Sequence, residues 1–510
     1  MTDRRRSAGP VAQGADASEE SGDGGATRLA AFAAGPILSL LVAWLPFASL
    51  SPDAHRLAAI LSCVVVYWIA EPIPLPMTAL LGTSAAVLFG LGTAKSIFAA
   101  YAHPIIFLFI GSFFLAEALA VHGVDRRFAL WMLSLPWVAG RPSRILMALG
   151  TVTAVISMWI SNTAATALAL PIALGVVNAL EQSSSGNFAA FRAGLLLMLS
   201  YAATAGGVAT VIGTPPNLIG VGLIAQQAKV TISFVTWMVF GLPLAVVMLF
   251  ISWRLLWLVF RPATDVLPDL AQFFRTQRAT LGPWTAGQRH ACLAFVLALI
   301  FWVGPGLLEA ALGETHPLPQ WFNAHLPNEL VALLAAGLLF FLPTDWRTGA
   351  FALSWKQATS ISWGTILLFG GGLAFGELMV KTGLAQAIGT GFVAFFGVTE
   401  LWSLTAVAIV VAVLVSELAS NTASASMLIP VVIAIAQTAG VSPVPPALGV
   451  CLAASLGFAL PVSTPPNAII YGTGLVPMRS MIRTGLVFDL IGSLVIWLTL
   501  RLLCPFLGLA

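Results

Sequence analysis

Long apolar stretches separated by short polar segments run through this chain from about residue 29 to its end. A membrane-spanning helix needs about 20 mostly apolar residues to cross the roughly 30 Å hydrocarbon layer of a bilayer. We therefore expect about 11 transmembrane helices, at residues 29–50, 55–71, 75–92, 103–121, 195–225, 233–260, 290–311, 329–343, 360–380, 447–475 and 483–505. The pattern predicts an all-α polytopic membrane protein.

Two further apolar stretches do not fit a single span. As one straight helix, residues 145–180 would be about 54 Å long at 1.5 Å per residue, far more than the hydrocarbon layer. A polar tripeptide, Ser161-Asn162-Thr163, interrupts this stretch, and Ser420-Asn421-Thr422 interrupts residues 403–436 in the same way. Polar clusters at membrane depth are costly and mark candidate functional sites. We expect two re-entrant hairpins with the tripeptides at their tips, where protein or water surrounds the irregular backbone.

The tripeptides belong to a larger duplication. Each is followed at the same distance by a proline, Pro171 or Pro430, and later by a Thr-Pro-Pro-Asn motif, at residues 214–217 and 464–467. Gly111, Glu117 and Gly123 also recur 260 residues later as Gly371, Glu377 and Gly383. Two homologous halves are the simplest explanation. Because each Pro-Pro pair removes two amide donors, the spans 195–225 and 447–475 should be interrupted there.

The composition excludes a soluble globular protein. The chain is 59% hydrophobic and 8% charged, whereas soluble domains are about 25% charged. The net charge of +3 is spread thinly, so we expect no nucleic-acid partner. We also expect no enzyme, because the sequence has no HExxH, GxSxG or phosphate-binding glycine-rich motif.

Basic residues concentrate in alternate loops, which indicates the orientation because Lys and Arg favour the cytoplasmic side. With the N-terminus in the cytoplasm, the segment 313–329 is due outside and contains no Lys or Arg. On this topology the C-terminus lies outside, and the two halves are inverted relative to each other. We expect an integral protein of a bacterial inner (plasma) membrane, with its substrate site at the repeat interface.

This topology predicts a division of the chain into six parts. They are a disordered cytoplasmic tail (1–27), N-terminal scaffold helices (28–95), a first inverted repeat (96–260) with a cytoplasmic-side hairpin (145–180), a cytoplasmic linker (261–289), scaffold helices of the second half (290–354), and a second inverted repeat (355–510) with an outer-side hairpin (403–436).

The chemistry of the motifs favours cation-coupled anion transport. Broken helices offer unpaired carbonyls to Na⁺ and half-helix N-termini to anions. Neither tripeptide and neither Thr-Pro-Pro motif contains Lys, Arg or His. A bound dianion would therefore take its counter-charge from mobile cations.

The doubled Ser-Asn-Thr and Thr-Pro-Pro-Asn motifs resemble those of the divalent anion/sodium symporters, which include INDY-like bacterial dicarboxylate carriers and mammalian citrate carriers. The resemblance covers about residues 100–505. It implies a homodimer with an elevator-type mechanism and at least two co-transported Na⁺. The implied Na⁺ ligands are Ser157, Ser161, Asn162 and Gly213 at site 1 and Ser416, Ala419, Asn421 and Ser463 at site 2. The implied substrate-binding residues are Asn162, Thr163, Asn421, Thr422, Pro215 and Pro465.

The resulting expectation is Na⁺-coupled secondary active uptake of a C4-dicarboxylate such as succinate, fumarate or malate by a protein whose partners are this anion, membrane lipid and a second copy. One alternative is a Na⁺-independent dicarboxylate exchanger on the same fold. Another is a proton-coupled ion antiporter of related architecture, in which Glu117, Glu377 or Glu417 would carry protons. We favour structural hydrogen bonds for Glu117 and Glu377, and for Glu417 a role in orienting the second hairpin tip, since a free carboxylate there would repel an anion.

Overall fold

The computed structural model describes residues 22–47, 49–138, 141–183, 188–262, 270–313 and 315–510. Most of the predicted tail, residues 1–21, lies outside this part, and the chain is helical from Gly22 onward in α1 (Gly22–Trp44). The described strands are β1 (Pro343–Asp345) and β2 (Ala350–Phe351), which pair as a short antiparallel hairpin. The predicted all-α architecture is confirmed.

Nine helical stretches in the described part are long and apolar enough to cross a membrane. They are α2 (Pro52–Ala70), the segment Ala94–Val121 that ends with α5 (Pro104–Val121), α9 (Ala189–Gly207), α11 (Phe234–Val259), α13 (Ala286–Leu312), α17 (Trp363–Thr382), α19 (Leu401–Leu418), α20 (Asn421–Thr438) and α23 (Met478–Phe506). The apolar parts of α1, α3 (Leu75–Leu88) and α15 (Asn328–Leu338) are shorter. The polytopic membrane fold is thus confirmed, while a count of eleven spans stays a prediction.

Both tripeptides lie where a helix stops and a second one starts. Helix α7 (Pro142–Ser157) is followed by a non-helical turn and then by α8 (Asn162–Ser183), and α19 and α20 are separated by Ala419 and Ser420. In each pair the two helices pack against each other. The predicted helix breaks at Ser-Asn-Thr are therefore present in both halves.

The Pro-Pro pairs also interrupt their helices as predicted. Helix α9 ends at Gly207 and α10 (Pro215–Leu223) begins at the first proline of its motif. In the same way α21 (Val444–Ala453) is separated from α22 (Pro465–Gly472). Proline suits the first position of a helix because the amide hydrogen it lacks would have no partner within the helix.

The two halves share one order of elements. Helices α5, α6 (Val124–Leu133) and α7–α11 correspond to α17, α18 (Leu384–Phe396) and α19–α23. The turn from the first helix to the second contains a glycine with positive φ in both halves, Gly123 at +65° and Gly383 at +81°. A side chain at either position would be strained by about 1–2 kcal/mol.

The leading helix of each half packs against a short helix from the other half. A Cβ on Gly111 of α5 would lie 2.6 Å from the carbonyl carbon of Ala332 in α15, and a Cβ on Gly371 of α17 would lie 2.6 Å from the Cβ of Ala79 in α3. Such close approach requires glycine at both positions. The contact of α5 with α15 is therefore equivalent to that of α17 with α3, although α3 lies before the repeated motifs in the sequence.

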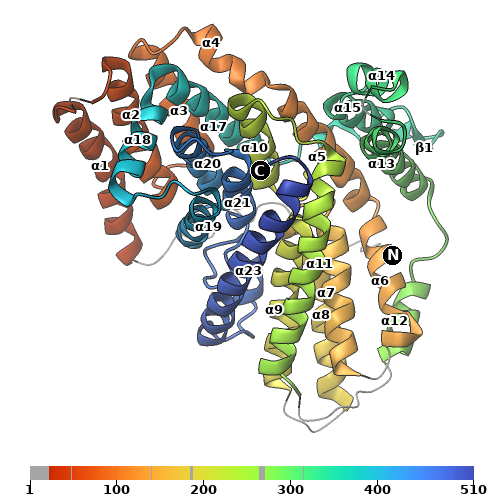
Figure 1. The fold of residues 1–510 in the computed structure, drawn as a ribbon. Coiled ribbons are helices and arrows are strands. Elements are labelled where there is room, and N and C mark those ends of the chain that lie inside the picture. The colour runs from red at the N-terminus through yellow and green to blue at the C-terminus, as the bar shows by residue number, and fades with distance from the viewer. Residues whose placement is uncertain (1–21, 48, 139–140, 184–187, 263–269, 314) are drawn as a thin grey trace, which may run out of the picture.

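Four further α-helices in the described part are short. They are α4 (Ala94–Phe98), α12 (Leu270–Ala279), α14 (Pro317–His325) and α16 (Trp355–Ala358). Figure 1 shows α1, α2 and α18 at one edge and α13, α14 and α15 at the opposite edge, with α7, α8, α9, α11 and α23 between and below them. The broken helices thus lie between these two edges or extend below them.

Three aromatic side chains pack together between α9, α23 and the loop after α21. The ring centroid of Tyr201 in α9 lies 4.8 Å from that of Phe458 and 5.1 Å from that of Phe488 in α23, and the two phenylalanine rings lie 4.6 Å apart. All three side chains are buried. The loop that follows α21 is therefore held between a helix of the first half and a helix of the second half.

The contact between α7 and α9 gives a stability prediction. A Cβ on Gly206 would lie 2.1 Å from the carbonyl oxygen of Ala154, so Gly206→Ala must push the two helices apart. We expect it to lower the free energy of unfolding by about 1–3 kcal/mol, as overpacking of a core does. The measurement is the thermal unfolding midpoint in detergent.

The control is Gly391→Ala in the middle of α18, where a Cβ would meet nothing within 4 Å. Alanine is a better helix former than glycine by about 0.5–1 kcal/mol, so this variant should be as stable as the parent or more so. An unchanged midpoint for Gly206→Ala would show that α7 and α9 are not in such close contact.

Candidate functional site

The first hairpin tip brings oxygen atoms from two helices together. Across the break between α7 and α8, the buried Ser157 donates a hydrogen bond from Oγ to Oδ1 of Asn162 at 2.8 Å. The end of α9 lies directly beside this pair, because a Cβ on Gly207 would be 2.4 Å from Asn162 Oδ1. A Cβ on Gly213 would in turn be 2.5 Å from the Gly207 carbonyl oxygen. Ser157, Asn162 and Gly213 of the implied site 1 are thus brought together.

Ser161, the fourth residue of that set, uses its side chain differently. Its Oγ accepts a hydrogen bond from the Ala164 amide at 3.2 Å, which caps the first turn of α8. The residue is exposed. Capping satisfies one of the amide groups that have no partner at a helix start, so Ser161 stabilises the break itself.

The second hairpin tip repeats the serine–asparagine contact. Ser416 Oγ lies 2.8 Å from Asn421 Oδ1 and 2.6 Å from the carbonyl oxygen of Ala454, while Asn421 Nδ2 donates to the carbonyl oxygen of Ser455 at 3.4 Å. A serine hydroxyl has one hydrogen and here faces two acceptors. Because this cluster has more acceptor oxygens than the hydroxyl can donate to, its geometry is suited to binding a small cation.

Ala419 and Ser463 complete the implied site 2. Ala419 is buried and has an extended backbone at the break between α19 and α20. The Ser463 hydroxyl lies 2.9 Å from the carbonyl oxygen of Glu417 and 2.6 Å from its Oε2. The residue that corresponds to Gly213 therefore has a side chain here, and Glu417 binds it.

The asparagine of each Thr-Pro-Pro-Asn motif holds the loop between the two parts of its broken helix. Asn217 Nδ2 donates to the carbonyl oxygens of Gly207 at 2.9 Å and Thr210 at 2.7 Å. Asn467 Nδ2 does the same with Gly457 at 2.8 Å and Leu460 at 2.9 Å. No role for these two residues is expected from the sequence motifs above, although an Asn follows each Pro-Pro pair in both halves.

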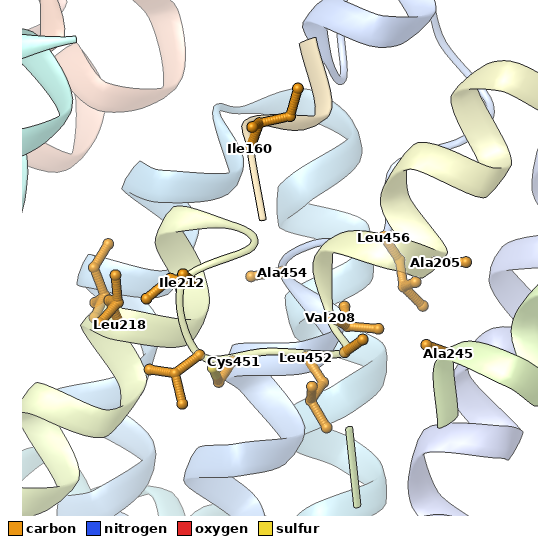
Figure 2. Close-up of a cluster of buried hydrophobic side chains, with 14 of the residues drawn as sticks. Ile160, Ala205, Val208, Ile212, Leu218, Ala245, Cys451, Leu452, Ala454 and Leu456 are labelled. Atoms are coloured by element: carbon orange, nitrogen blue, oxygen red, sulfur yellow. The ribbon is translucent and has the colours of Figure 1, made fainter. Parts of the chain in front are cut away.

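The broken helices cross from one half to the other. Helix α10 packs against α20 and α21, and α22 packs against α8 and α9. Figure 2 shows the apolar cluster at this crossing, in which Ile212 and Leu218 of the first half lie near Cys451 of the second. Polar contacts reinforce it, since Ser200 Oγ donates to Asn467 Oδ1 and Cys451 Sγ donates to the Pro216 carbonyl oxygen at 3.0 Å. Both half-sites therefore belong to one central region.

Four helices begin at these breaks, and the N-terminal end of a helix attracts anions through its unpaired amides and its dipole. Asn162 and Thr163 form the start of α8, and Asn421 and Thr422 form the start of α20; all four are partly exposed. At the starts of α10 and α22, Pro215 is partly exposed and Pro465 is exposed. The implied substrate residues thus lie at helix starts with accessible surface.

The three glutamates considered as proton carriers occupy different environments. Glu417 is buried, and its carboxylate accepts hydrogen bonds from the amides of Ala459 at 2.9 Å and Leu460 at 3.3 Å, besides the bond from Ser463. This geometry supports the predicted orienting role. Glu117 hydrogen-bonds Ser360, and Glu377 is exposed on α17.

Comparison with known proteins places the chain in a family. A family model described as "Sodium:sulfate symporter transmembrane region" matches residues 27–509. The sodium-dependent dicarboxylate transporter SdcS of Staphylococcus saprophyticus is 30% identical over 465 residues, which is 90% of this chain and 87% of that protein. SdcS of Staphylococcus aureus strain USA300 is 31% identical over 88% of this chain and 85% of its own length.

A likeness to a solved structure is more distant. The YdaH transporter of Alcanivorax borkumensis has a TM-score of 0.53 at 15% sequence identity, covering 81% of this chain and 87% of that one. At this identity the likeness concerns the fold alone. The family match and the likeness in fold together indicate a transporter and not an enzyme. The chain belongs to the sodium:sulfate symporter family, the divalent anion/sodium symporters that its repeated motifs indicate.

Proposed function

We propose that this chain is a Na⁺-coupled uptake carrier for C4-dicarboxylates such as succinate, fumarate and malate. The observation that carries the proposal is the pair of equivalent tips, Ser157 with Asn162 and Ser416 with Asn421, each joined at 2.8 Å beside helix starts. The names of the SdcS relatives, sodium-dependent dicarboxylate transporters, support the choice of ion and substrate.

At least two Na⁺ ions would be co-transported, one at each tip. Hard cations of this kind prefer oxygen ligands. Site 1 would use Ser157, Ser161, Asn162 and Gly213, and site 2 would use Ser416, Ala419, Asn421 and Ser463. At the second tip the Ala454 carbonyl oxygen, 2.6 Å from Ser416 Oγ, is a further candidate ligand.

The anion would lie between the tips. Its two carboxylates would meet the starts of α8 and α20 at Asn162, Thr163, Asn421 and Thr422, with the turns at Pro215 and Pro465 closing the site. No Lys, Arg or His occurs in these motifs, so the bound Na⁺ ions would supply the counter-charge. This dependence of the anion on the cations is the physical basis of coupling, because each ligand binds better once the other is present.

Energetics favour cotransport over simple uptake. Moving a dianion inward against 100 mV of inside-negative potential costs about 4.6 kcal/mol, at about 2.3 kcal/mol per charge. Two Na⁺ ions cancel this electrical cost and add the energy of their own gradient. A third positive charge would let the potential itself drive uptake.

The large movement would be an elevator-type displacement of the hairpins against the scaffold helices of a homodimer. The repeat order supports this view, since one part of an inverted-repeat transporter commonly moves as a rigid body against the other. The protein would lie in a bacterial inner membrane with its N-terminus in the cytoplasm and its C-terminus outside.

The deciding experiment is uptake of radiolabelled succinate into proteoliposomes at fixed pH. An inward Na⁺ gradient is compared with the same gradient of K⁺ or choline, with and without internal succinate. We expect accumulation that requires Na⁺ and needs no internal substrate, and that unlabelled malate suppresses more strongly than sulfate. Uptake that ignores Na⁺ and requires internal succinate would instead establish an exchanger.

The tip asparagines should be essential for ion coupling. Asn162→Ala and Asn421→Ala each remove an oxygen ligand and an amide at a helix start. Because a contact with a charged group contributes about 1.5–3 kcal/mol, we expect the Na⁺ concentration for half-maximal uptake to rise roughly tenfold or more.

A matched control for these variants is Asn323→Ala in α14. Asn323 is exposed and contacts Glu309 at 3.5 Å, far in the sequence from either tip motif. It should transport as the parent does. Normal Na⁺ dependence in both tip variants would refute the assignment of the two half-sites.

The proposed orientation can be checked by single-cysteine labelling in a background without the four native cysteines. Cysteine replacing Ala510 should react with an impermeant maleimide added outside intact cells, because the C-terminus is proposed to lie there. Cysteine replacing Arg275, in the proposed cytoplasmic linker, should react only after permeabilisation. The reverse pattern would invert the topology.

A further inference from the structure

The loop between α21 and α22 forms one wall of the second hairpin tip. The carbonyl oxygen of Ala454 accepts a hydrogen bond from Ser416 Oγ at 2.6 Å. The carbonyl oxygen of Ser455 accepts one from Asn421 Nδ2 at 3.4 Å. Ser463 of the implied site 2 lies near the end of the same loop. The conformation of this loop therefore determines where several oxygen atoms of the proposed second cation site lie.

The side chain of Asn467 holds the loop in this conformation. Its Nδ2 donates to the carbonyl oxygens of Gly457 at 2.8 Å and Leu460 at 2.9 Å. Both amide hydrogens are then used, so the orientation of the amide is fixed and Oδ1 is left as an acceptor. Ser200 Oγ, from α9 of the first half, donates to this oxygen. Both side chains are fully buried.

The equivalent asparagine of the first half, Asn217, lacks such a bond. Its Nδ2 binds two loop carbonyl oxygens in the same way, but its Oδ1 has no hydrogen-bond partner among the described residues. The spacing from Asn217 to Asn467 is 250 residues, and 250 residues after Ser200 the chain has Val450. Helices α10 and α21 pack together as α22 and α9 do. The repeated fold alone therefore does not require the bond, and the Ser200 hydroxyl is specific to the second loop.

Helix α9 is a rigid support for this loop. It is buried throughout residues 193–207, and a Cβ on Gly206 would lie 2.1 Å from the Ala154 carbonyl oxygen of α7. The ring centroid of Tyr201, next to Ser200, lies 4.8 Å from that of Phe458 in the loop. The loop is thus held against α9 by one polar and one aromatic contact.

We propose that Ser200 is a positioning residue for the second cation site. Its hydrogen bond fixes the Asn467 side chain, and Asn467 in turn fixes the loop that carries the Ala454 and Ser455 carbonyl oxygens. Ser200 acts through Asn467 and contacts neither ion. This role rests on the proposed Na⁺-coupled function, which it deepens by naming a residue of the first half that sets the cation affinity of the second half-site.

Preorganisation is the physical reason for the effect. A site whose ligands already lie at the right distances loses little conformational freedom when the ion binds. Without the Ser200 hydroxyl, the buried Oδ1 of Asn467 has no donor, and the loop has to be ordered when Na⁺ binds. The ligands themselves are unchanged. The affinity for Na⁺ therefore falls, while transport by the fully occupied carrier does not.

The test is Ser200→Ala, with succinate uptake into proteoliposomes measured over a range of Na⁺ concentrations. We expect the Na⁺ concentration for half-maximal uptake to rise roughly threefold to tenfold, the range that one hydrogen bond accounts for. The maximal rate at saturating Na⁺ should stay close to that of the parent. Ser200→Cys, which keeps a weak donor, should lie between the two. A purely structural role would instead lower the maximal rate and leave the Na⁺ dependence unchanged.

The matched control is Ser252→Ala in α11. Ser252 is also fully buried, and its hydroxyl donates to the Met248 carbonyl oxygen of its own helix at 2.8 Å. The substitution removes the same atom from a membrane helix without removing a contact between the halves. Its Na⁺ dependence should equal that of the parent. The proposal is overturned if Ser200→Ala and Ser252→Ala give the same Na⁺ dependence.

A double-mutant cycle identifies the half-site on which Ser200 acts. Ser416→Ala removes the hydroxyl of the second tip, and Ser157→Ala removes that of the first. Residues that act on one site are coupled, whereas distant and independent residues have additive effects. Ser200→Ala should therefore change the Na⁺ dependence less in the Ser416→Ala background than in the parent, and fully in the Ser157→Ala background. Equal changes in the two backgrounds would contradict a role at the second site.

The parent protein keeps this inference separate from the proposed function. If the parent shows no Na⁺-driven succinate uptake, the proposed function fails, and equilibrium ²²Na⁺ binding in detergent then compares the parent with Ser200→Ala directly. Weaker binding by the variant would support the positioning role, and equal binding would refute it. If the parent requires Na⁺ and Ser200→Ala has the same Na⁺ dependence, the positioning role alone is refuted.

Discussion

A helix that stops inside a membrane leaves amide and carbonyl groups that lipid cannot satisfy, and the repeated motifs create four such breaks in the described part of this chain. Side chains from the motifs themselves stabilise three of these breaks. Ser161 caps the start of α8, and Asn217 and Asn467 bind the carbonyl groups of the two loops after α9 and α21. The site therefore depends on keeping irregular backbone inside protein, and the crossing of α10 and α22 between the halves achieves this.

The two halves are alike in backbone and unlike in charge. Both tips join a buried serine to an asparagine at the same distance, and both loops are bound by an asparagine at the same spacing. Gly213 corresponds to Ser463, however, and Met158 corresponds to Glu417. The two proposed cation half-sites thus share one geometry while their electrostatic surroundings differ, so the two ions would bind with different affinity.

The tip motifs contain no basic side chains, and this absence limits how they can bind an anion. A fixed Lys or Arg would attract the dianion in every conformation. A bound cation would instead dissociate on the side of the membrane where its concentration is low, and the anion would then lose its counter-charge. On the proposed site assignment, the neutral hydroxyl and amide groups at the helix starts would contact both the cation and the anion, because such groups both donate and accept. Coupling would then need no group at the tips that changes its own charge.

Local chemistry in the sequence determined where the helices break. A polar tripeptide or a Pro-Pro pair acts within its own segment, so the breaks near Asn162, Asn421, Pro215 and Pro465 could be predicted, as could the equivalence of the halves. The number of spans could not, since α3 and α15 are shorter helices than their apolar runs suggest. Only the tertiary structure decided which breaks meet, that Asn217 and Asn467 bind the loops, and that Glu417 binds Ser463. These contacts join residues far apart in the chain, and no local pattern of hydrophobic and polar positions records them.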